Sequence, residues 1–339
     1  MFFKETNAHK QGFIFIGAAL IVLLISNLGL AATIVMGDFS WESVQVHNRI
    51  AGFILEHGYG HEIEYMFGES IPILLGLARG DVDVVTELWL DNLYEAVLEG
   101  VAAEEIISLG ANYPDAPQGW YVPTYVIEGD PKRGIEAVAP DLKTVFDLKN
   151  YAHLFPDQMD RNKGRFYNAP TGWVAHDINN AKIEAYGLAE TFTSFNTGSD
   201  AGLSTAILRA YDRGEPIVAY NWEPNWVVGL LDLTLLEEPA YDPRQWNDDF
   251  GTAYPASKVH IFVNSEFPVK APRAAGFLAN YNTTLEQTNE FLAYMEEENA
   301  GLEDVALWFL ANNTETWQSW IIDQEIVEKV NKALAGELE

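Results

Sequence analysis

The chain has 339 residues, a length that suits one large or two medium-sized domains. Its 50 acidic and 20 basic residues give a formal net charge of −30, which argues against nucleic acid or an anionic membrane surface as a partner. The absence of cysteine excludes disulfides, thiolate metal sites, cysteine catalysis and the lipid anchor of a bacterial lipoprotein.

The N-terminal segment has the pattern of a secretory signal. Lys4 and Lys10 precede an apolar run at 12–25, and small residues follow up to Ala31. These features predict a signal peptide that is cleaved after Ala31, and we assign residues 1–32 to it. Because apolar residues continue beyond that point, an uncleaved N-terminal anchor is the alternative. Both interpretations place the rest of the chain outside the cytoplasm.

From residue 33 onward, strand and helix patterns alternate. The first part of the chain predicts strands at 33–39, 63–68 and 81–89 and helices at 40–60, 70–80 and 92–100. This order of strand, helix, strand, helix and strand predicts a mainly parallel sheet that is covered by helices on both faces.

A second unit begins near Tyr125. Its patterns predict helices at 144–155, 174–188 and 202–214, strands at 165–170 and 216–222, and closing helices within 285–321. The two units together predict an α/β fold of two lobes with a ligand cleft between them. In this division, lobe I takes residues 33–125 and 256–339, and lobe II takes residues 126–255.

Four tryptophans fall at strand ends or in the loops that follow them, namely Trp41, Trp89, Trp173 and Trp222. Ligands of open parallel sheets bind beyond the carboxyl ends of the strands, so we expect these indoles to converge on one cleft. Several indole faces suit a cation without N–H donors, such as a quaternary ammonium group, because each well-placed ring attracts it by about 0.5–2 kcal/mol. The alternative is that each tryptophan packs in the core or at an interface.

The stretch APTGWVAHD places Trp173 directly before a predicted helix. The first backbone N–H groups of a helix have no internal partner and bind anions, so the amides of Trp173, Val174 and Ala175 are candidate donors. His176 is a further candidate donor, or alternatively a partly exposed residue of the first turn. A ligand with a cationic head and a carboxylate tail would then be met at both ends.

Several segments that contain these residues occur in a characteristic order, namely LLGLARGDVDVVTELW, GWYVPTYV, APTGW, AILRAYDRGEPIVAYNWEPNW and AYPASKVHIFVN. Together with the closing helices they span most of residues 33–322. In this order they resemble the glycine betaine/choline-type substrate-binding proteins of ABC transporters. The resemblance implies the type II periplasmic binding protein fold, in which the ligand cleft lies between two lobes.

Carried over to this chain, the resemblance implies a tryptophan box of Trp89, Trp173 and Trp222. Trp41 occupies the place where choline-binding members have a further aromatic wall. The resemblance also implies an additional wall from a tyrosine, which the spacing leaves open between Tyr121 and Tyr125.

The chain departs from the family's pattern after the first-lobe tryptophan. Some members place a histidine there to meet the ligand's carboxylate, whereas WLDNL offers Asp91 and Asn92. An Asp91 side chain directed into the pocket would favour choline over betaine as the ligand.

The predicted function is the capture of a quaternary ammonium solute, such as glycine betaine, proline betaine or choline, by the binding protein of an ABC importer. The implied partners are an inner-membrane permease and its cytoplasmic ATPase, the implied location is the periplasm, and no cofactor or metal is expected. A sensing module for the same solutes is one alternative. A secreted carboxylate-dependent hydrolase is the other, although the G-x-S-x-G and H-E-x-x-H motifs are absent.

Overall fold

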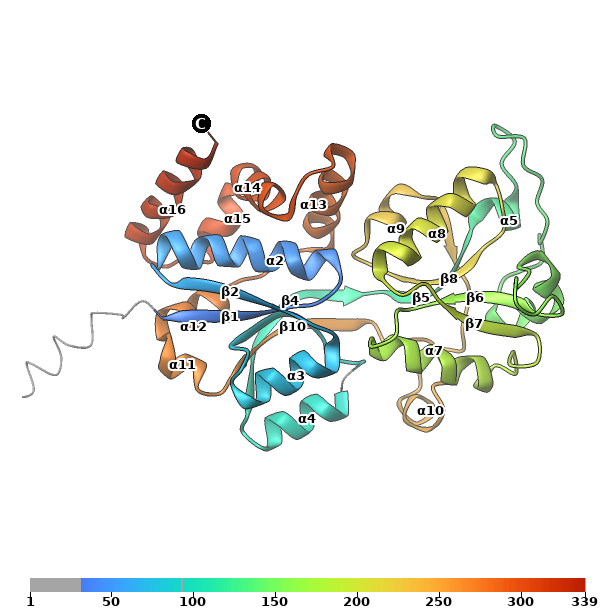
Figure 1. Cartoon of the computed structure of the whole chain (residues 1–339), viewed down its shortest axis with the longest axis horizontal. Coiled ribbons are helices and arrows are strands. Elements are labelled where there is room, and N and C mark those ends of the chain that lie inside the picture. The colour runs from blue at the N-terminus through green and yellow to red at the C-terminus, as the bar shows by residue number, and fades with distance from the viewer. Residues whose placement is uncertain (1–31, 93, 339) are drawn as a thin grey trace, which may run out of the picture.

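The computed structural model describes residues 32–92 and 94–338. The chain forms two lobes that lie side by side along the longest axis of the molecule, and each lobe is built on one five-stranded sheet (Figure 1). Helices cover both faces of each sheet (Figure 1). The two-lobed α/β architecture that the sequence predicts is therefore confirmed.

The sheet of the first lobe has the strand order β2-β1-β3-β10-β4. Its strands are β1 (Thr33–Asp38), β2 (Glu62–Phe67), β3 (Val84–Trp89), β4 (Ile106–Ala116) and β10 (Ser257–Asn264). β1 pairs in parallel with β2 and β3, as the alternating pattern predicts, and β10 pairs antiparallel with β3 and β4. The carboxyl ends of β1 and β3 therefore lie at the same edge of the sheet.

The helix α2 (Glu42–Phe53) follows β1, packs against α14 and ends in a π-helical turn at Ile54–Gly58. α3 (Ser70–Arg79) ends at Gly80, whose φ of 83° is the left-handed conformation that stops many helices. The other helices of this lobe are α4 (Tyr94–Ala102), α11 (Phe267–Lys270), α12 (Pro272–Leu278), α13 (Leu285–Glu298), α14 (Leu302–Asn312), α15 (Thr314–Ser319) and α16 (Gln324–Glu337).

The sheet of the second lobe has the strand order β7-β6-β8-β5-β9. Its strands are β5 (Gln118–Pro123), β6 (Gly164–Asn168), β7 (Phe192–Asn196), β8 (Val218–Trp222) and β9 (Leu233–Leu235). β6 pairs in parallel with β7 and β8, whereas β5 pairs antiparallel with β8 and β9. The carboxyl ends of β6 and β8 therefore share one edge, as those of β1 and β3 do in the first lobe.

The helices of the second lobe differ in part from the predicted ones. They are α5 (Thr124–Glu128), α6 (Leu148–Tyr151), α7 (Val174–Ala185), α8 (Asp200–Arg213), α9 (Trp226–Leu230) and α10 (Pro243–Asp248). The helix predicted at 144–155 is present as α6 between two 3₁₀ turns, Val145–Asp147 and Ala152–Leu154. The strands β5, β7 and β9 were not among the predicted elements.

The chain passes between the two sheets at two places. Pro117 separates β4 of the first sheet from β5 of the second, and the chain returns to the first sheet at Ser257, where β10 begins. Lobe II is predicted to begin at residue 126, whereas β5 already pairs with β8 in the second sheet. The earlier crossing escapes the sequence pattern because β4 contains glycine, proline and aspartate, which are uncommon in strands.

Gln118, the first residue of β5, forms hydrogen bonds beside both crossings. Its side-chain amide exchanges hydrogen bonds with that of Asn92, at 3.1 and 3.3 Å. The same amide donates to Ser257 Oγ at 3.2 Å and accepts from the Tyr220 hydroxyl at 2.8 Å. Gln118 therefore joins residues of both lobes at the base of the cleft.

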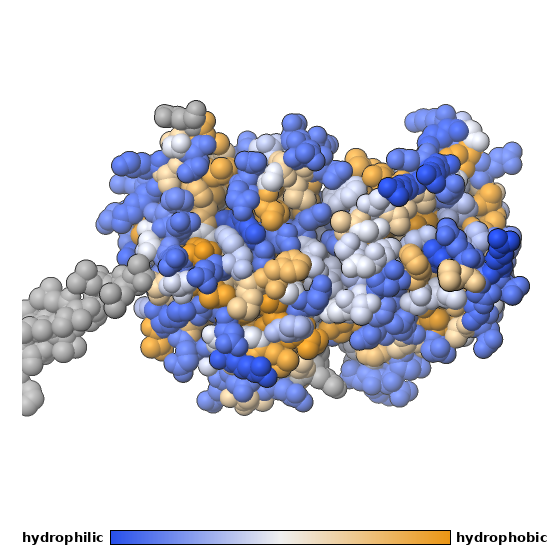
Figure 2. Space-filling model, in the orientation of Figure 1, coloured by the Kyte–Doolittle hydropathy of each residue, from blue (hydrophilic) through white to orange (hydrophobic). Residues whose placement is uncertain are grey.

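Figure 2 shows hydrophilic side chains over most of the visible face, in keeping with the net charge of −30. Apolar side chains gather around α3 and the end of β2, where Phe67 is 66 % exposed and Ile71 and Leu75 are 43 % and 49 % exposed. Among the described residues, no helix combines the length and the apolar character that a membrane span requires. The predicted signal peptide or anchor lies outside the described residues, apart from residue 32.

Candidate ligand-binding site

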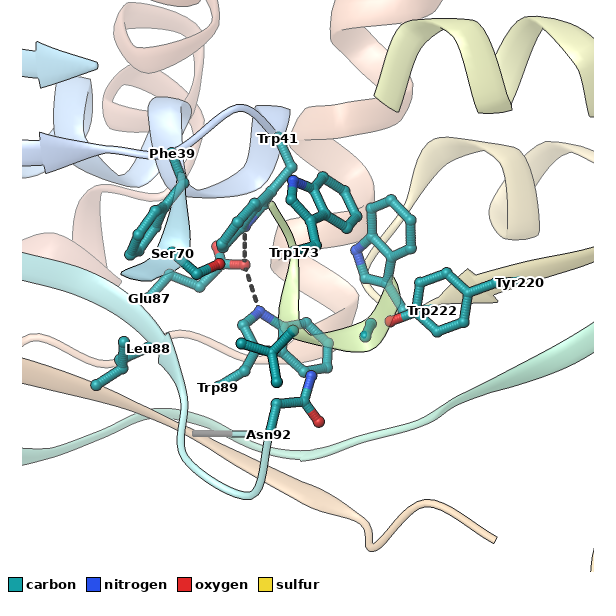
Figure 3. A pocket seen from close by; sticks show the side chains of 12 residues that line it. Phe39, Trp41, Ser70, Glu87, Leu88, Trp89, Asn92, Trp173, Tyr220 and Trp222 are labelled. Atoms are coloured by element: carbon teal, nitrogen blue, oxygen red, sulfur yellow. Dashed lines mark hydrogen bonds between the residues drawn. The ribbon is translucent and has the colours of Figure 1, made fainter. Parts of the chain in front are cut away.

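Four tryptophans from both lobes line one pocket between the lobes (Figure 3). Trp41 lies between β1 and α2, Trp89 ends β3, Trp173 precedes α7, and Trp222 ends β8. All four side chains are buried. The other lining residues are Phe39, Ser70, Glu87, Leu88, Asn92, Val174, Ala175 and Tyr220. We refer to this site as the four-tryptophan pocket.

The Trp173 indole contacts two other indoles edge to face, Trp41 of lobe I and Trp222 of its own lobe II. The centroid of the Trp173 ring lies 5.2 Å from that of Trp41 and 5.0 Å from that of Trp222, with an interplanar angle of 76° in both pairs. Phe39 stacks on Trp41 at 4.5 Å, and Tyr220 stacks on Trp222 at 5.7 Å. A second layer of rings therefore supports the first, and the Trp41–Trp173 contact exists only while the lobes are close together.

Glu87 is a buried carboxyl group in the wall of the pocket, and two of the tryptophans share it. Its Oε1 accepts hydrogen bonds from the indole N–H groups of Trp41, at 2.6 Å, and Trp89, at 3.1 Å (Figure 3). Ser43 Oγ donates to the same oxygen at 2.9 Å. Burial raises the pKa of Glu87 to about 7, although these hydrogen bonds act in the opposite direction.

A buried polar network lies behind Glu87. The Tyr113 ring of β4 stacks on the His47 ring of α2 at 5.8 Å, and His47 Nδ1 shares a hydrogen bond of 2.8 Å with the Tyr281 hydroxyl. Burial lowers the pKa of His47 to about 3 and, together with the nearby Glu87 carboxyl, raises the pKa of both tyrosines well above the usual value. All three groups are therefore neutral at physiological pH.

A chain of hydrogen bonds links the lobes beside the pocket. The indole N–H of Trp173 donates to Ser40 Oγ at 2.9 Å, and Ser40 Oγ donates to Glu69 Oε2 at 3.1 Å. Gly172 lies against Glu69, because a Cβ at this position would be 2.9 Å from Glu69 Cγ. The φ of Gly172 is 103°, a backbone angle that residues other than glycine rarely adopt. Glycine at position 172 thus allows the loop of lobe II to approach lobe I closely.

The N-terminus of α7 opens on the pocket at Val174 and Ala175. These are the first two residues of the helix, whose backbone N–H groups have no acceptor within the helix and feel its positive dipole end. The N–H of Trp173, by contrast, donates to the carbonyl of Pro170 at 3.2 Å, so that predicted donor is already engaged. The pocket thus combines a carboxyl group from lobe I with a helix N-terminus from lobe II.

Buried polar contacts hold α7 in the position that presents this N-terminus. Asn179 accepts from the indole N–H of Trp120 at 2.8 Å and donates to Asn168 Oδ1 at 2.9 Å. One turn further along, the buried ammonium group of Lys182 lies 2.6 Å from Glu238 Oε1. The orientation of α7 therefore depends on groups that belong to the core of lobe II.

Four residues that the sequence analysis considered for the site lie outside the pocket lining, and two of them are the tyrosines. Tyr121 is buried within β5, where it pairs with Ala219 of β8. The Tyr125 hydroxyl donates to the backbone carbonyls of Ala210, at 3.1 Å, and Glu215, at 2.7 Å. Tyr125 thus anchors the end of α8 and does not face the ligand cleft.

The other two are polar residues whose side chains are engaged elsewhere. The Nδ1 atom of His176 lies 2.8 Å from the carbonyl oxygen of Ala169, so the imidazole closes the loop before α7. Asp91 Oδ2 accepts from the backbone N–H of Lys258 at 3.2 Å, which ties the end of β3 to β10. The neighbouring Asn92 lines the pocket instead.

Sequence reasoning missed several lining residues, of which Glu87 is the most informative. Side chains two residues apart on a strand point to the same face, so Trp89 implies that Glu87 faces the pocket. The same rule connects Tyr220 with Trp222 on β8. This period of two was the signal that would have found both residues.

Comparison with known proteins identifies the family of this chain. The family described as the substrate binding domain of ABC-type glycine betaine transport systems, OpuAC, matches residues 32–312. The trimethylamine N-oxide-binding protein of Pelagibacter ubique is 24 % identical over 88 % of this chain and 96 % of its own length. The glycine betaine/proline betaine-binding periplasmic protein of Escherichia coli is 26 % identical over 72 % of this chain and 73 % of its own length.

Solved structures that are similar to this chain show the same fold. An ABC-transporter choline-binding protein in complex with choline has a TM-score of 0.73 at 20 % identity and covers 89 % of this chain and 98 % of that one. The glycine betaine/L-proline-binding protein of Borrelia burgdorferi has a TM-score of 0.71 at 17 % identity, over 88 % of this chain and 99 % of that one. The predicted type II periplasmic binding protein fold is confirmed.

The family match covers most of the chain and concerns proteins that bind a solute without converting it, so the hydrolase alternative is set aside. The resemblance recognised in the sequence is confirmed. The chain belongs to the family of substrate-binding domains of ABC-type glycine betaine transport systems.

Proposed function

We propose that this protein captures a small solute with a fully substituted ammonium group and delivers it to an ABC importer. The observation that carries the proposal is the four-tryptophan pocket, in which indoles from both lobes surround one site. The names of the relatives, which bind trimethylamine N-oxide or glycine betaine and proline betaine, support the same ligand class.

The cation would be held mainly by ring faces. Each well-placed indole contributes about 0.5–2 kcal/mol, so four rings supply about 2–8 kcal/mol toward the roughly 8 kcal/mol that a micromolar Kd represents. Trp41 and Trp89 belong to lobe I, whereas Trp173 and Trp222 belong to lobe II. A ligand that contacts all four rings stabilises the closed arrangement of the lobes over an open one, because only the closed arrangement brings the rings together.

The oxygen end of the solute would lie toward α7. The amides of Val174 and Ala175 present unpaired N–H groups and the positive end of a helix dipole to the pocket. The Asn92 side chain, which Gln118 orients, adds a further polar contact. The pocket therefore favours solutes whose oxygen is bonded to the cationic nitrogen or lies within a few bonds of it, such as trimethylamine N-oxide, glycine betaine or choline.

The proposed setting is the periplasm. The similar proteins of Escherichia coli and Dickeya dadantii are periplasmic by name, and the N-terminal segment of this chain has the pattern of an export signal or anchor. The proposed partners are an inner-membrane permease and its cytoplasmic ATPase, which fits the transport system that names the family.

Calorimetric titration of residues 33–339 with six solutes tests this proposal. The solutes are glycine betaine, proline betaine, choline, carnitine, trimethylamine N-oxide and dimethylsulfoniopropionate. We expect micromolar or tighter binding of one or two of them, loss of that binding in Trp222→Leu, and retention in Trp308→Leu. Trp308 is the matched control because it stacks on Tyr294 outside the pocket. Absence of heat with all six solutes, from a folded protein, would contradict the proposal.

A further inference from the structure

Glu87 stands out because it is a buried carboxyl group without a cationic partner. It is 0 % exposed, and its three hydrogen-bond donors, Trp41, Ser43 and Trp89, all contact one oxygen, Oε1. The other oxygen, Oε2, has no hydrogen bond of ordinary geometry among the described residues, although the Tyr113 hydroxyl lies close enough to lower the pKa of the carboxyl group. None of the described lysines, arginines and histidines forms an ion pair with Glu87.

Three other buried carboxylates are paired with a cation, namely Asp38 with Arg49, Asp83 with Lys270, and Asp157 with Arg165. Asp200 is buried without a cationic partner among the described residues, and its Oδ1 accepts from Ser204 Oγ at 3.1 Å. This pairing follows the general cost of placing an ionised carboxylate in an apolar interior, which is large unless a cation compensates it. Glu87 must therefore be compensated by something else, and the two possibilities are a bound proton and the cation of the ligand.

The groups that face Glu87 from neighbouring elements do not supply a charge. Tyr113 of β4, His47 of α2 and Tyr281 after α12 are neutral at physiological pH, since burial shifts each pKa away from neutrality. On the pocket side, Glu87 meets the rings of Trp41 and Trp89.

The charged groups nearest along these elements are engaged elsewhere. Arg49 of α2 lies 2.7 Å from Asp38, and Glu69 before α3 accepts from Ser40. Glu42 begins α2 and lies near the buried Asp200 of lobe II. Burial and then the Glu296 carboxylate raise the pKa of Glu42, and burial and then the Glu42 carboxylate raise the pKa of Asp200. Neither carboxyl group lines the pocket, so they form a separate acidic pair between the lobes.

We propose that Glu87 is the counter-ion of the bound cation and that it releases a proton when a cationic solute enters the four-tryptophan pocket. This inference rests on the proposed function. In the step that follows, the O–H bond of the carboxylic acid breaks, the proton passes to water, and the carboxylate remains paired with the ammonium group. The ammonium group of the solute thus replaces the proton as the positive charge beside the buried carboxylate of Glu87.

The pKa of Glu87, which burial raises to about 7, puts this exchange in the physiological range. Above pH 8 the carboxylate is already ionised and binding releases little proton. Below pH 7 the cation must displace a proton, so affinity falls as the pH falls. A permanent cation such as choline gains more from the carboxylate than glycine betaine does, because the carboxylate of betaine opposes part of the attraction.

Calorimetric titration with choline and glycine betaine, in buffer pairs of different ionisation enthalpy, counts the released protons. If the bound cation keeps Glu87 ionised, choline releases about 0.9 proton at pH 6 and about 0.1 at pH 8. The Kd for choline is then about tenfold higher at pH 6 than at pH 8. Glu87→Gln is expected to abolish the proton release, to remove this pH dependence, and to weaken choline more than betaine at pH 8.

Two further variants make the outcome decisive. Glu87→Asp keeps the charge and is expected to retain proton release, whereas Glu42→Gln removes the neighbouring acidic pair and is also expected to retain it. Two results would overturn this inference and leave the proposed function intact. One is the loss of proton release in Glu42→Gln, and the other is binding of a solute by the wild-type protein without any proton release. Failure of the wild-type protein to bind any of the solutes would instead remove the proposed function. If Glu87→Gln does not fold, the wild-type proton count and the other two variants still decide the question.

Discussion

The indole N–H of Trp41 donates to Oε1 of Glu87 at 2.6 Å, so an aromatic wall of the pocket and its buried carboxyl group form one unit. The same oxygen accepts from Trp89 at 3.1 Å. A carboxylate that accepts from both indoles fixes the planes of these rings and places negative charge behind them. Both effects favour a cation in front of the rings.

Trp173→Leu is expected to weaken binding of the preferred solute by about 2- to 30-fold, the range that one cation–π contact is worth. The loss should fall toward the upper end, because the Trp173 ring contacts both Trp41 and Trp222 and supports their positions. Calorimetric titration measures the change. An equal loss in the Trp308→Leu control would show that the effect is not specific to the pocket.

Ser40→Ala tests the hydrogen bond that joins the lobes beside the pocket. The variant removes the acceptor of the Trp173 indole N–H, so the closed arrangement should lose about 0.5–1.5 kcal/mol and affinity should fall by about 2- to 10-fold. Because the bond joins lobes and lies outside each core, the melting temperature without solute should stay nearly unchanged. A lower melting temperature with unchanged affinity is the opposite result and would assign Ser40 a purely structural role.

Lys182→Met is expected to destabilise the protein by about 3–5 kcal/mol, because it leaves the carboxylate of Glu238 buried without a cation. Burial lowers the pKa of Lys182, and the charge of Glu238 opposes that effect, so each partner depends on the other. Adding Glu238→Gln to Lys182→Met should recover part of the loss. Urea unfolding measures both variants, and a cost below about 1 kcal/mol for the single change would contradict this description.

The raised pKa of Glu87 also predicts a pH dependence of stability. The carboxyl group has a pKa of about 7 in the folded protein and 4.5 as its ordinary value, so the folded state binds more protons between these two values. Its contribution to stability is complete below about pH 4.5 and is lost as the pH rises through 7. The free energy of unfolding of Glu87→Gln, relative to wild type, should therefore rise by an order of 2–3 kcal/mol from pH 5 to pH 8.

Urea unfolding at the two pH values measures this difference. Glu315→Gln, which changes an exposed side chain on α15, serves as the control and should track the wild-type protein at both. A Glu87→Gln variant that also tracks the wild-type protein at pH 5 and pH 8 would mean that Glu87 is not a buried acid with a raised pKa.

The sequence predicts the place of the four indoles because the carboxyl ends of parallel strands meet at one edge of a sheet. Trp89 and Trp222 end their strands, and Trp41 and Trp173 lie in the loops that follow β1 and β6. The polar part of the site follows a different rule. Glu87 was overlooked because an acidic residue on a strand is usually a solvated one, and only its spacing from Trp89 places it beside the pocket.

The sequence pattern could not predict the roles of residues whose contacts come from distant parts of the chain. Tyr125 follows the GWYVP segment closely, yet its hydroxyl bonds the carbonyls of Ala210 and Glu215, which lie 85 and 90 residues away in the chain. Asp91 and Asn92 are adjacent, and only the pairing of Asn92 with Gln118 determines which of them lines the pocket. The crossing at Pro117 lies within YPDAPQG, whose prolines, aspartate and glycine predict a loop instead of the junction of two strands, so the start of lobe II was placed too late.

A crystal structure with the tightest-binding solute would show whether the four-tryptophan pocket holds the cation of the solute. We expect the ammonium carbon atoms within about 6 Å of the ring centroids of Trp41, Trp89, Trp173 and Trp222. We also expect the solute's oxygen near the amides of Val174 and Ala175. A solute bound elsewhere on the protein, with the four indoles still packed against one another, would rule out this pocket as the binding site.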